Sequence, residues 1–111
     1  MSAITVEQEK YKGLTVVHLS GRLDSETLGR LESALGPLAA ECEAGVALDL
    51  AEVSYLNSAA LRLMLTIHRD LSSSDKNLHI VGAQGFVNEV LDVTGMKGFL
   101  SLKTSLDDIE G

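Results

Sequence analysis

The sequence contains few aromatic residues, one cysteine and no long apolar run. Its 111 residues include no tryptophan, 2 tyrosines and 2 phenylalanines, which leaves little material for the aromatic surfaces on which single-stranded nucleic acids stack. The lone Cys42 has no partner for an internal disulfide, and this favours a reducing compartment. Neither a signal-peptide pattern nor the ~20 apolar residues of a spanning helix is present. We therefore expect a soluble cytoplasmic protein without membrane insertion.

Positive charge is also scarce. The 9 Lys and Arg residues are outnumbered by 16 Asp and Glu residues, and the formal net charge is −7. Such a charge opposes binding to nucleic acids and to anionic membranes. Apolar side chains are plentiful, at 45% of the sequence, and can build a hydrophobic core. At this length we expect residues 1–111 to form a single domain whose partner is a protein or a small molecule.

The first apolar pattern is that of a β-hairpin. Apolar and polar residues alternate in two segments, near residues 2–9 and 13–20, and a short bend that ends at Gly13 separates them. Alternation with a period of two places one face of each strand against a core. The sequence thus predicts two antiparallel strands at the start of the domain.

A helix is expected after the hairpin. Asp24 or Ser25 stands in the N-cap position, and leucines recur with helical spacing at positions 28, 31, 35 and 38. Pro37 should kink or shorten this helix, because a proline inside a helix removes a hydrogen bond and clashes with the preceding turn.

Strands and helices then alternate along the chain. The sequence predicts a buried strand at 46–50 with Asp49 near its end, a helix at 58–71 and a strand at 77–82. It then predicts a helix that Gly95 closes, with Phe86, Val87, Val90 and Leu91 on one face. An edge strand at 99–102 and a short terminal helix that Thr104 and Asp107 cap follow. Such alternation predicts parallel strands joined by right-handed crossovers. The expected fold class is α/β, with a mixed four- to five-stranded sheet led by a β-hairpin and about four helices.

The helix at residues 58–71 carries the most informative polar pattern. Ser58 begins this helix, and Arg62, Thr66 and Arg69 follow at spacings that place all four residues on one side. The helix is otherwise so apolar that we expect most of its surface to be buried. A serine in this place is a helix cap, a catalytic nucleophile or a residue that is modified.

The residues around Ser58 bear differently on these three alternatives. Either Ser58 or Asn57 can cap the helix by accepting a backbone N–H bond. A phosphoryl group on Ser58 would meet unpaired N–H groups and the positive end of the helix dipole, with Arg62 one turn away. A nucleophile elbow needs glycines where this sequence has Leu56 and Ala60. Because no cluster of His, Cys, Asp or Glu has metal-binding spacing either, we expect no enzyme activity, no metal and no cofactor.

The segment LDLAEVSYLNSAALRLML, preceded by SGRLDSETLGRLESAL and by the hairpin, resembles the STAS domains of anti-sigma factor antagonists. The resemblance extends over nearly the whole chain and implies a STAS-like fold. In that family, a serine that matches Ser58 is phosphorylated by a partner anti-sigma factor that is also a serine kinase, and a serine phosphatase removes the phosphate. The resemblance therefore implies a binding switch that sequesters the kinase when Ser58 is unphosphorylated.

The expected site follows from the resemblance and from the polar stripe. The residues expected to bind the partner are Asp24, Asn57, Ser58, Arg62 and Arg69. The residues expected to support the site structurally are Gly21, Asp49 and Ala60.

Two positions differ from the family motif. Asn57 stands where many members have Asp, and it keeps the capping ability while removing a negative charge beside the hydroxyl. Ala60 stands where most members have Gly and favours the helix by up to ~1 kcal/mol. The alternative function is a constitutive structural STAS subunit of a transporter or a signalling scaffold, in which Ser58 is only a helix cap.

Overall fold

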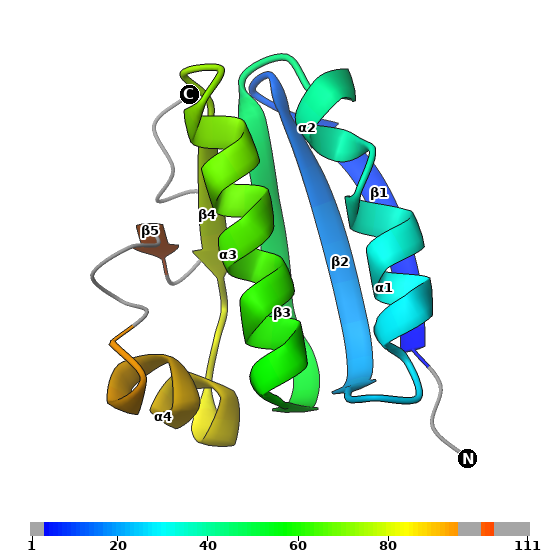
Figure 1. Cartoon of the computed structure of the whole chain (residues 1–111), viewed down its shortest axis with the longest axis vertical. Coiled ribbons are helices and arrows are strands. Elements are labelled where there is room, and N and C mark those ends of the chain that lie inside the picture. Colours follow the sequence, from blue (N-terminus) through cyan, green and yellow to red (C-terminus); the bar gives the residue numbers. More distant parts are fainter. Residues whose placement is uncertain (1–3, 96–100, 104–111) are drawn as a thin grey trace.

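A computed structural model of the protein describes residues 4–95 and 101–103. Five strands form one sheet in the order β1-β2-β3-β4-β5. The elements are β1 (Ile4–Tyr11), β2 (Leu14–Leu23), α1 (Leu28–Leu35), α2 (Leu38–Glu41), β3 (Gly45–Leu56), α3 (Ser58–Ser72), β4 (Asn77–Val81), α4 (Gly85–Val93) and β5 (Ser101–Lys103). The helices α1, α2 and α3 lie in front of the sheet in Figure 1, and α4 lies at the end of the molecule where α3 begins.

The sheet is mixed, as predicted, and the hairpin leads it. β1 pairs with β2 in antiparallel register from Ile4↔Gly21 to Tyr11↔Leu14. Lys12 and Gly13 form the turn with φ angles of 51° and 83°. Two residues with positive φ are typical of the tight hairpin turns whose twist matches that of the strands. The remaining strands pair in parallel.

The first helix begins later than expected and is short. The Asp24 carboxylate accepts hydrogen bonds from the N–H groups of Glu26 at 3.0 Å and Thr27 at 3.3 Å, which forms a turn ahead of the helix. The N-cap residue of α1 is therefore Thr27 and not Asp24 or Ser25, and the helix starts at Leu28. It ends before Pro37, and α2 is a separate four-residue turn, so the expected effect of the proline is confirmed.

The strand predicted at residues 46–50 is longer than expected. β3 extends over twelve residues and pairs with β2 from Leu14↔Gly45 to Leu23↔Leu56. Asp49 therefore lies in the middle of the strand and not near its end, which corrects that prediction. The extension is possible because the pairing continues through two register shifts in which β3 supplies the extra residues.

The helix α3 and the strand β4 agree with the predicted ranges to within one residue. The described ranges contain three helices of eight residues or more and the single turn α2, which corrects the expectation of about four helices. After Pro37 the chain forms only the four-residue turn α2 and no full helix. The terminal helix that Thr104 and Asp107 were expected to cap begins outside the described residues, as does part of the edge strand expected at 99–102. No described helix is long and apolar enough to cross a membrane.

The hydrophobic core lies between the sheet and the helices that cover it. Its largest fully buried side chains are Leu23, Leu31, Leu35, Leu48, Leu50, Leu56, Met64, Ile67, Leu71, Leu78, Ile80 and Leu91. Burying a leucine or isoleucine side chain contributes roughly 1.5–3 kcal/mol. Because both flanks of the β3–α3 connection belong to this core, the start of α3 is held in a fixed position.

Candidate functional site: a serine at the start of α3

Ser58 is the first residue of α3 and its side chain is exposed. Only Asn57 separates it from the end of β3. The N–H group of Asn57 donates a hydrogen bond to the carbonyl of Leu23 at 3.1 Å, which ties the connection to the end of β2. The serine is thus presented at the rim of the sheet by two strands that end side by side.

The helix cap is Asn57 and not Ser58. Asn57 has an extended backbone, with φ −110° and ψ −180°, and its Oδ1 atom accepts a hydrogen bond from the N–H group of Ala60 at 3.0 Å. This is the geometry of an N-cap residue. The Ser58 hydroxyl makes no side-chain hydrogen bond within the described part of the chain. The interpretation of Ser58 as a helix cap is therefore wrong, because its neighbour performs that role.

The loop that contains Asp24 lies beside the site, as expected. The Nδ2 atom of Asn57 is 3.5 Å from the hydroxyl of Ser25. The Asp24 side chain is only 18% exposed, and Arg22 Nε lies 3.5 Å from its Oδ2 atom. Its Oδ1 atom accepts the hydrogen bonds of its own turn. Asp24 thus orders its own turn, with little of its side chain open to solvent, and the contact of the loop with Asn57 comes from Ser25.

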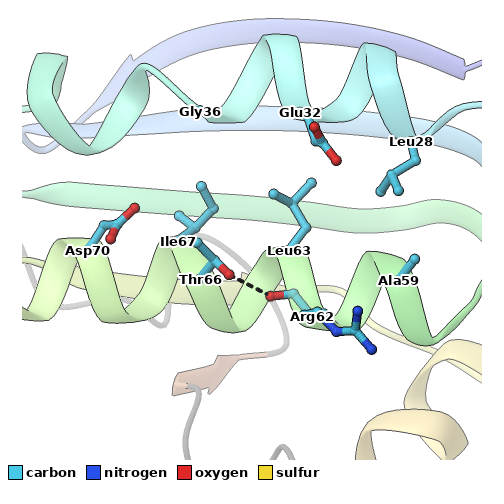
Figure 2. A pocket seen from close by; sticks show the side chains of 9 residues that line it. All are labelled: Leu28, Glu32, Gly36, Ala59, Arg62, Leu63, Thr66, Ile67 and Asp70. Atoms are coloured by element: carbon cyan, nitrogen blue, oxygen red, sulfur yellow. Dashed lines mark hydrogen bonds between the residues drawn. The ribbon is translucent and has the colours of Figure 1, made fainter.

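The polar stripe of α3 is present and includes an apolar residue. Arg62 and Arg69 are both exposed, and neither makes an ion pair with any other described residue. Figure 2 shows the Arg62 side chain extending toward the N-terminal turn of α3, where Ala59 lies. Leu65 lies between the two arginines and is 37% exposed. The helix is therefore less buried than its composition predicted.

Two surface hollows flank this stripe. One lies between α1 and α3 and is lined by Leu28, Glu32, Gly36, Ala59, Arg62, Leu63, Thr66, Ile67 and Asp70 (Figure 2). The other is lined by Arg62, Leu65, Thr66, His68, Arg69 and Ser72. Because Arg62 and Thr66 line both hollows, they form the ridge that divides them. Ala59, the residue after Ser58, lines the first hollow, so this hollow adjoins the first turn of α3.

The structure does not bring every expected residue to the serine. Asp49 Oδ2 contacts His18 Nδ1 at 2.6 Å, and Asp49 Oδ1 accepts the N–H of Ala51 at 3.0 Å, so its carboxylate is engaged in the middle of β3. Gly21 lies in β2 with φ 101°. Ala60 is 1% exposed and serves the cap through its backbone.

A charged cluster on β1, β2 and β3 was not foreseen from the sequence. His18 bridges the sheet, with Nε2 at 2.6 Å from Glu9 Oε2 and Nδ1 at 2.6 Å from Asp49 Oδ2. The hydrogen bond to Asp49, aided by the one to Glu9, raises the pKa of His18 above its ordinary value of 6.5. No group of three or more His, Cys, Asp or Glu side chains in the described ranges is arranged to hold a metal ion.

An exposed aromatic contact near the serine was also missed. Arg22 lies over the ring of Tyr55, with its Cζ atom 4.2 Å from the ring centroid. The ring of Tyr55 stacks on that of Phe86 at a centroid distance of 5.4 Å. The three residues lie on β2, β3 and α4, and only the strand register brings Arg22 opposite Tyr55.

Comparisons with known proteins agree with this description. A family model described as the STAS domain matches residues 5–109. An anti-sigma-B factor antagonist from Staphylococcus epidermidis is 32% identical over 97 residues, which covers 87% of this chain and 90% of that protein. The crystal structure of an anti-sigma factor antagonist from Mycobacterium paratuberculosis superposes with a TM-score of 0.87 at 27% identity and covers 96% of this chain and 90% of that one. The unphosphorylated anti-sigma factor antagonist SpoIIAA shares the fold, with a TM-score of 0.78 at 14% identity and coverage of 94% and 91%.

Proposed function

The chain belongs to the STAS domain family, and we propose that it is an anti-sigma factor antagonist whose binding to its partner is switched by phosphorylation of Ser58. The partner is an anti-sigma factor with serine kinase activity, which the unphosphorylated protein sequesters. The proposal is supported by the antagonist named among its relatives, which is 32% identical over 97 residues.

The observation that carries the proposal is that Asn57, and not Ser58, caps α3. The exposed Ser58 hydroxyl makes no side-chain hydrogen bond within the described residues, so the fold does not depend on it. A phosphoryl group added there would lie at the positive end of the helix dipole, which favours negative charge. The modification would then leave the fold intact and change only the surface.

Charge explains how the modification would release the partner. The protein already carries a formal charge of −7, and a phosphoserine adds about −1.5 to −2 at neutral pH. An ordinary interface covers about 800 Å² per partner, and an unpaired dianion within it would cost several kcal/mol in desolvation. Phosphorylation of Ser58 would therefore oppose docking.

The other residues of the proposed interface surround the serine. Arg62 and Arg69 supply exposed positive charge along α3, and Asn57 and the loop of Asp24 form the neighbouring rim. The protein itself performs no chemistry in this scheme. The kinase supplies ATP and Mg²⁺, and a separate serine phosphatase restores the unphosphorylated form in the cytoplasm.

The alternative of a constitutive structural subunit loses its main support. That interpretation assigned Ser58 to capping, whereas the hydrogen bond to the Ala60 N–H group comes from Asn57. No observation in the structure favours a transporter or a scaffold as the partner.

Phosphorylation in vitro tests the proposal. The wild-type protein is incubated with the serine-kinase anti-sigma factors of the source organism and Mg-ATP, and its intact mass is measured. We expect one phosphoryl group on wild type and none on Ser58→Ala, with Ser25→Ala as the matched control that is still modified. Stoichiometric phosphorylation of Ser58→Ala would show that the acceptor lies elsewhere and would overturn the proposal.

A further inference from the structure

Three side chains from separate elements form a stack on the surface beside the site. Arg22 of β2 lies over one face of the Tyr55 ring at 4.2 Å, and Phe86 of α4 stacks on Tyr55 with an angle of 8° between the ring planes. We refer to Arg22, Tyr55 and Phe86 as the aromatic stack. Its members hold one another in place, so little side-chain entropy remains to be lost if a partner binds there.

The aromatic stack is open to solvent. Phe86 is 47% exposed and the Arg22 side chain is 54% exposed. The whole sequence has only 2 tyrosines and 2 phenylalanines, so one of each is used in this surface feature. A scattered exposed apolar residue carries little information. An exposed, ordered group of arginine and aromatic rings has the composition of an interface hot spot.

The aromatic stack lies at the same rim of the sheet as Ser58. In the parallel register, Arg22 lies opposite Tyr55 and the next pair is Leu23↔Leu56. The carbonyl of Leu23 then accepts the N–H of Asn57 at 3.1 Å. Arg22 and Ser58 are thus each one residue away from the two ends of this hydrogen bond. At the same rim, Arg22 Nε lies 3.5 Å from Asp24 Oδ2, and the hydroxyl of the neighbouring Ser25 lies 3.5 Å from Asn57 Nδ2. One loop therefore connects the aromatic stack to the residue that precedes Ser58.

We infer that the partner that binds at Ser58 also binds the aromatic stack, which serves as its anchor, the contact that contributes most to the affinity. This inference rests on the proposed function. The partner segment that fits carries an apolar side chain, which packs on Phe86, next to a carboxylate, which pairs with Arg22. A guanidinium stacked on a ring keeps its N–H edge for carboxylates. The only ion pair of Arg22 in the described part of the chain is the 3.5 Å contact with Asp24.

This chemistry explains why the anchor and the serine would act together. A phosphate on Ser58 would add negative charge at the rim of the sheet that also carries Arg22, and it would oppose the approach of a carboxylate of the partner to that guanidinium. Phosphorylation would thereby weaken the anchor as well as the contact at Ser58 itself. The sign of the effect agrees with release of the partner on phosphorylation.

The rival role for the aromatic stack is structural, since Phe86 also ties α4 to β3. Binding and stability must therefore be measured separately. Arg22→Lys keeps the charge but removes the planar fork, and Phe86→Ala removes the apolar surface. Phe86→Tyr keeps the ring and should rescue binding. Val93→Ala is the matched control, because Val93 is on the same helix and is 81% exposed.

The test is titration calorimetry against the purified serine-kinase anti-sigma factor that binds wild type, with thermal melts of each variant. We expect Phe86→Ala and Arg22→Lys to weaken binding about tenfold or more, as truncation of a hot spot does. Val93→Ala and Phe86→Tyr should bind like wild type, and Arg22→Lys should melt like wild type.

Two outcomes separate this inference from the proposed function. If Phe86→Ala and Arg22→Lys bind like wild type while Ser58→Asp binds weakly, the aromatic stack is not the anchor and the switch stands. If Ser58→Asp also binds like wild type, or if no serine-kinase anti-sigma factor of the organism binds wild type, the proposed function is overturned and the inference with it.

Discussion

The Oδ1 atom of Asn57 accepts a hydrogen bond from the N–H group of Ala60 at 3.0 Å, and this contact caps α3. Ser58 lies between these two residues without taking part in the contact. The cap and the proposed phosphorylation site are therefore adjacent residues, and substitutions can separate the two roles.

The first prediction concerns this separation. Asn57→Ala removes the cap and should lower the free energy of unfolding by about 0.5–2 kcal/mol, whereas Ser58→Ala should change it by less than about 0.5 kcal/mol. Urea unfolding of both variants measures these values. Asn57→Asp is the control, because an aspartate also caps a helix and should retain stability. A larger loss for Ser58→Ala than for Asn57→Ala would contradict the assigned cap.

A second prediction concerns a fixed charge at the serine. Ser58→Asp places a carboxylate in the first turn of α3, where the dipole should leave stability unchanged or raise it by about 0.3–1 kcal/mol. Affinity for the kinase partner should fall, since the charge lies within the proposed interface. Ser58→Asn introduces a side chain of nearly the same shape as Ser58→Asp does, but without the charge. It should therefore bind the partner more tightly than Ser58→Asp. Equal affinities for these two variants would show that charge is not the cause of the weaker binding.

A third prediction concerns pH. The pKa of His18 is raised by its hydrogen bonds to Asp49 and Glu9, so the folded protein binds the proton more tightly than the unfolded chain does. The resulting stability is fully present below the ordinary pKa of 6.5 and is lost as pH rises through the higher folded-state value. The melting temperature should therefore fall across this interval.

The control for the pH effect is His18→Gln, which cannot titrate. Melts of wild type and of this variant are recorded from below pH 6.5 upward. The melting temperature of the variant should not show the fall that wild type shows in this pH range. Identical pH profiles for the two proteins would mean that the bridge from Glu9 to Asp49 does not stabilise the fold through the charge of His18.

A fourth prediction uses two glycines. Gly45 has φ +151°, and a Cβ atom there would overlap the carbonyl oxygen of Asn77. Gly45→Ala should therefore destabilise the protein by about 1–3 kcal/mol or more. Gly29 lies in α1 with nothing near an added Cβ, so Gly29→Ala should stabilise by roughly 0.5–1 kcal/mol. Denaturant titration of the pair checks both signs, and a destabilised Gly29→Ala would contradict the packing described for α1.

The sequence predicted the features that depend on local periodicity. Alternating residues on both sides of Gly13 identified the hairpin, helical spacing identified α3, and Pro37 marked the end of α1. The length of β3 was underestimated, because its continuation depends on the partner strand β2 and on two register shifts. Pairing across strands is a non-local property that periodicity within one strand does not contain.

The site was predicted only in part, because some of its contacts also depend on pairing between strands. The position of Ser58 at the start of a helix followed from the sequence, but two adjacent capping residues left the cap undecided until the hydrogen bond of Asn57 was known. The contacts of His18 with Asp49 and of Arg22 with Tyr55 depend on the register between β2 and β3. No spacing along the chain encodes either contact.

The most direct measurement of the central claim compares the affinity of one partner for two forms of this protein. Wild type that is fully phosphorylated on Ser58 and unmodified wild type are each titrated against the same serine-kinase anti-sigma factor, in the absence of ATP. We expect the unmodified form to bind, and we expect phosphorylation to weaken binding by more than about tenfold with little change in the melting temperature. Equal affinities of the two folded forms would contradict the central claim.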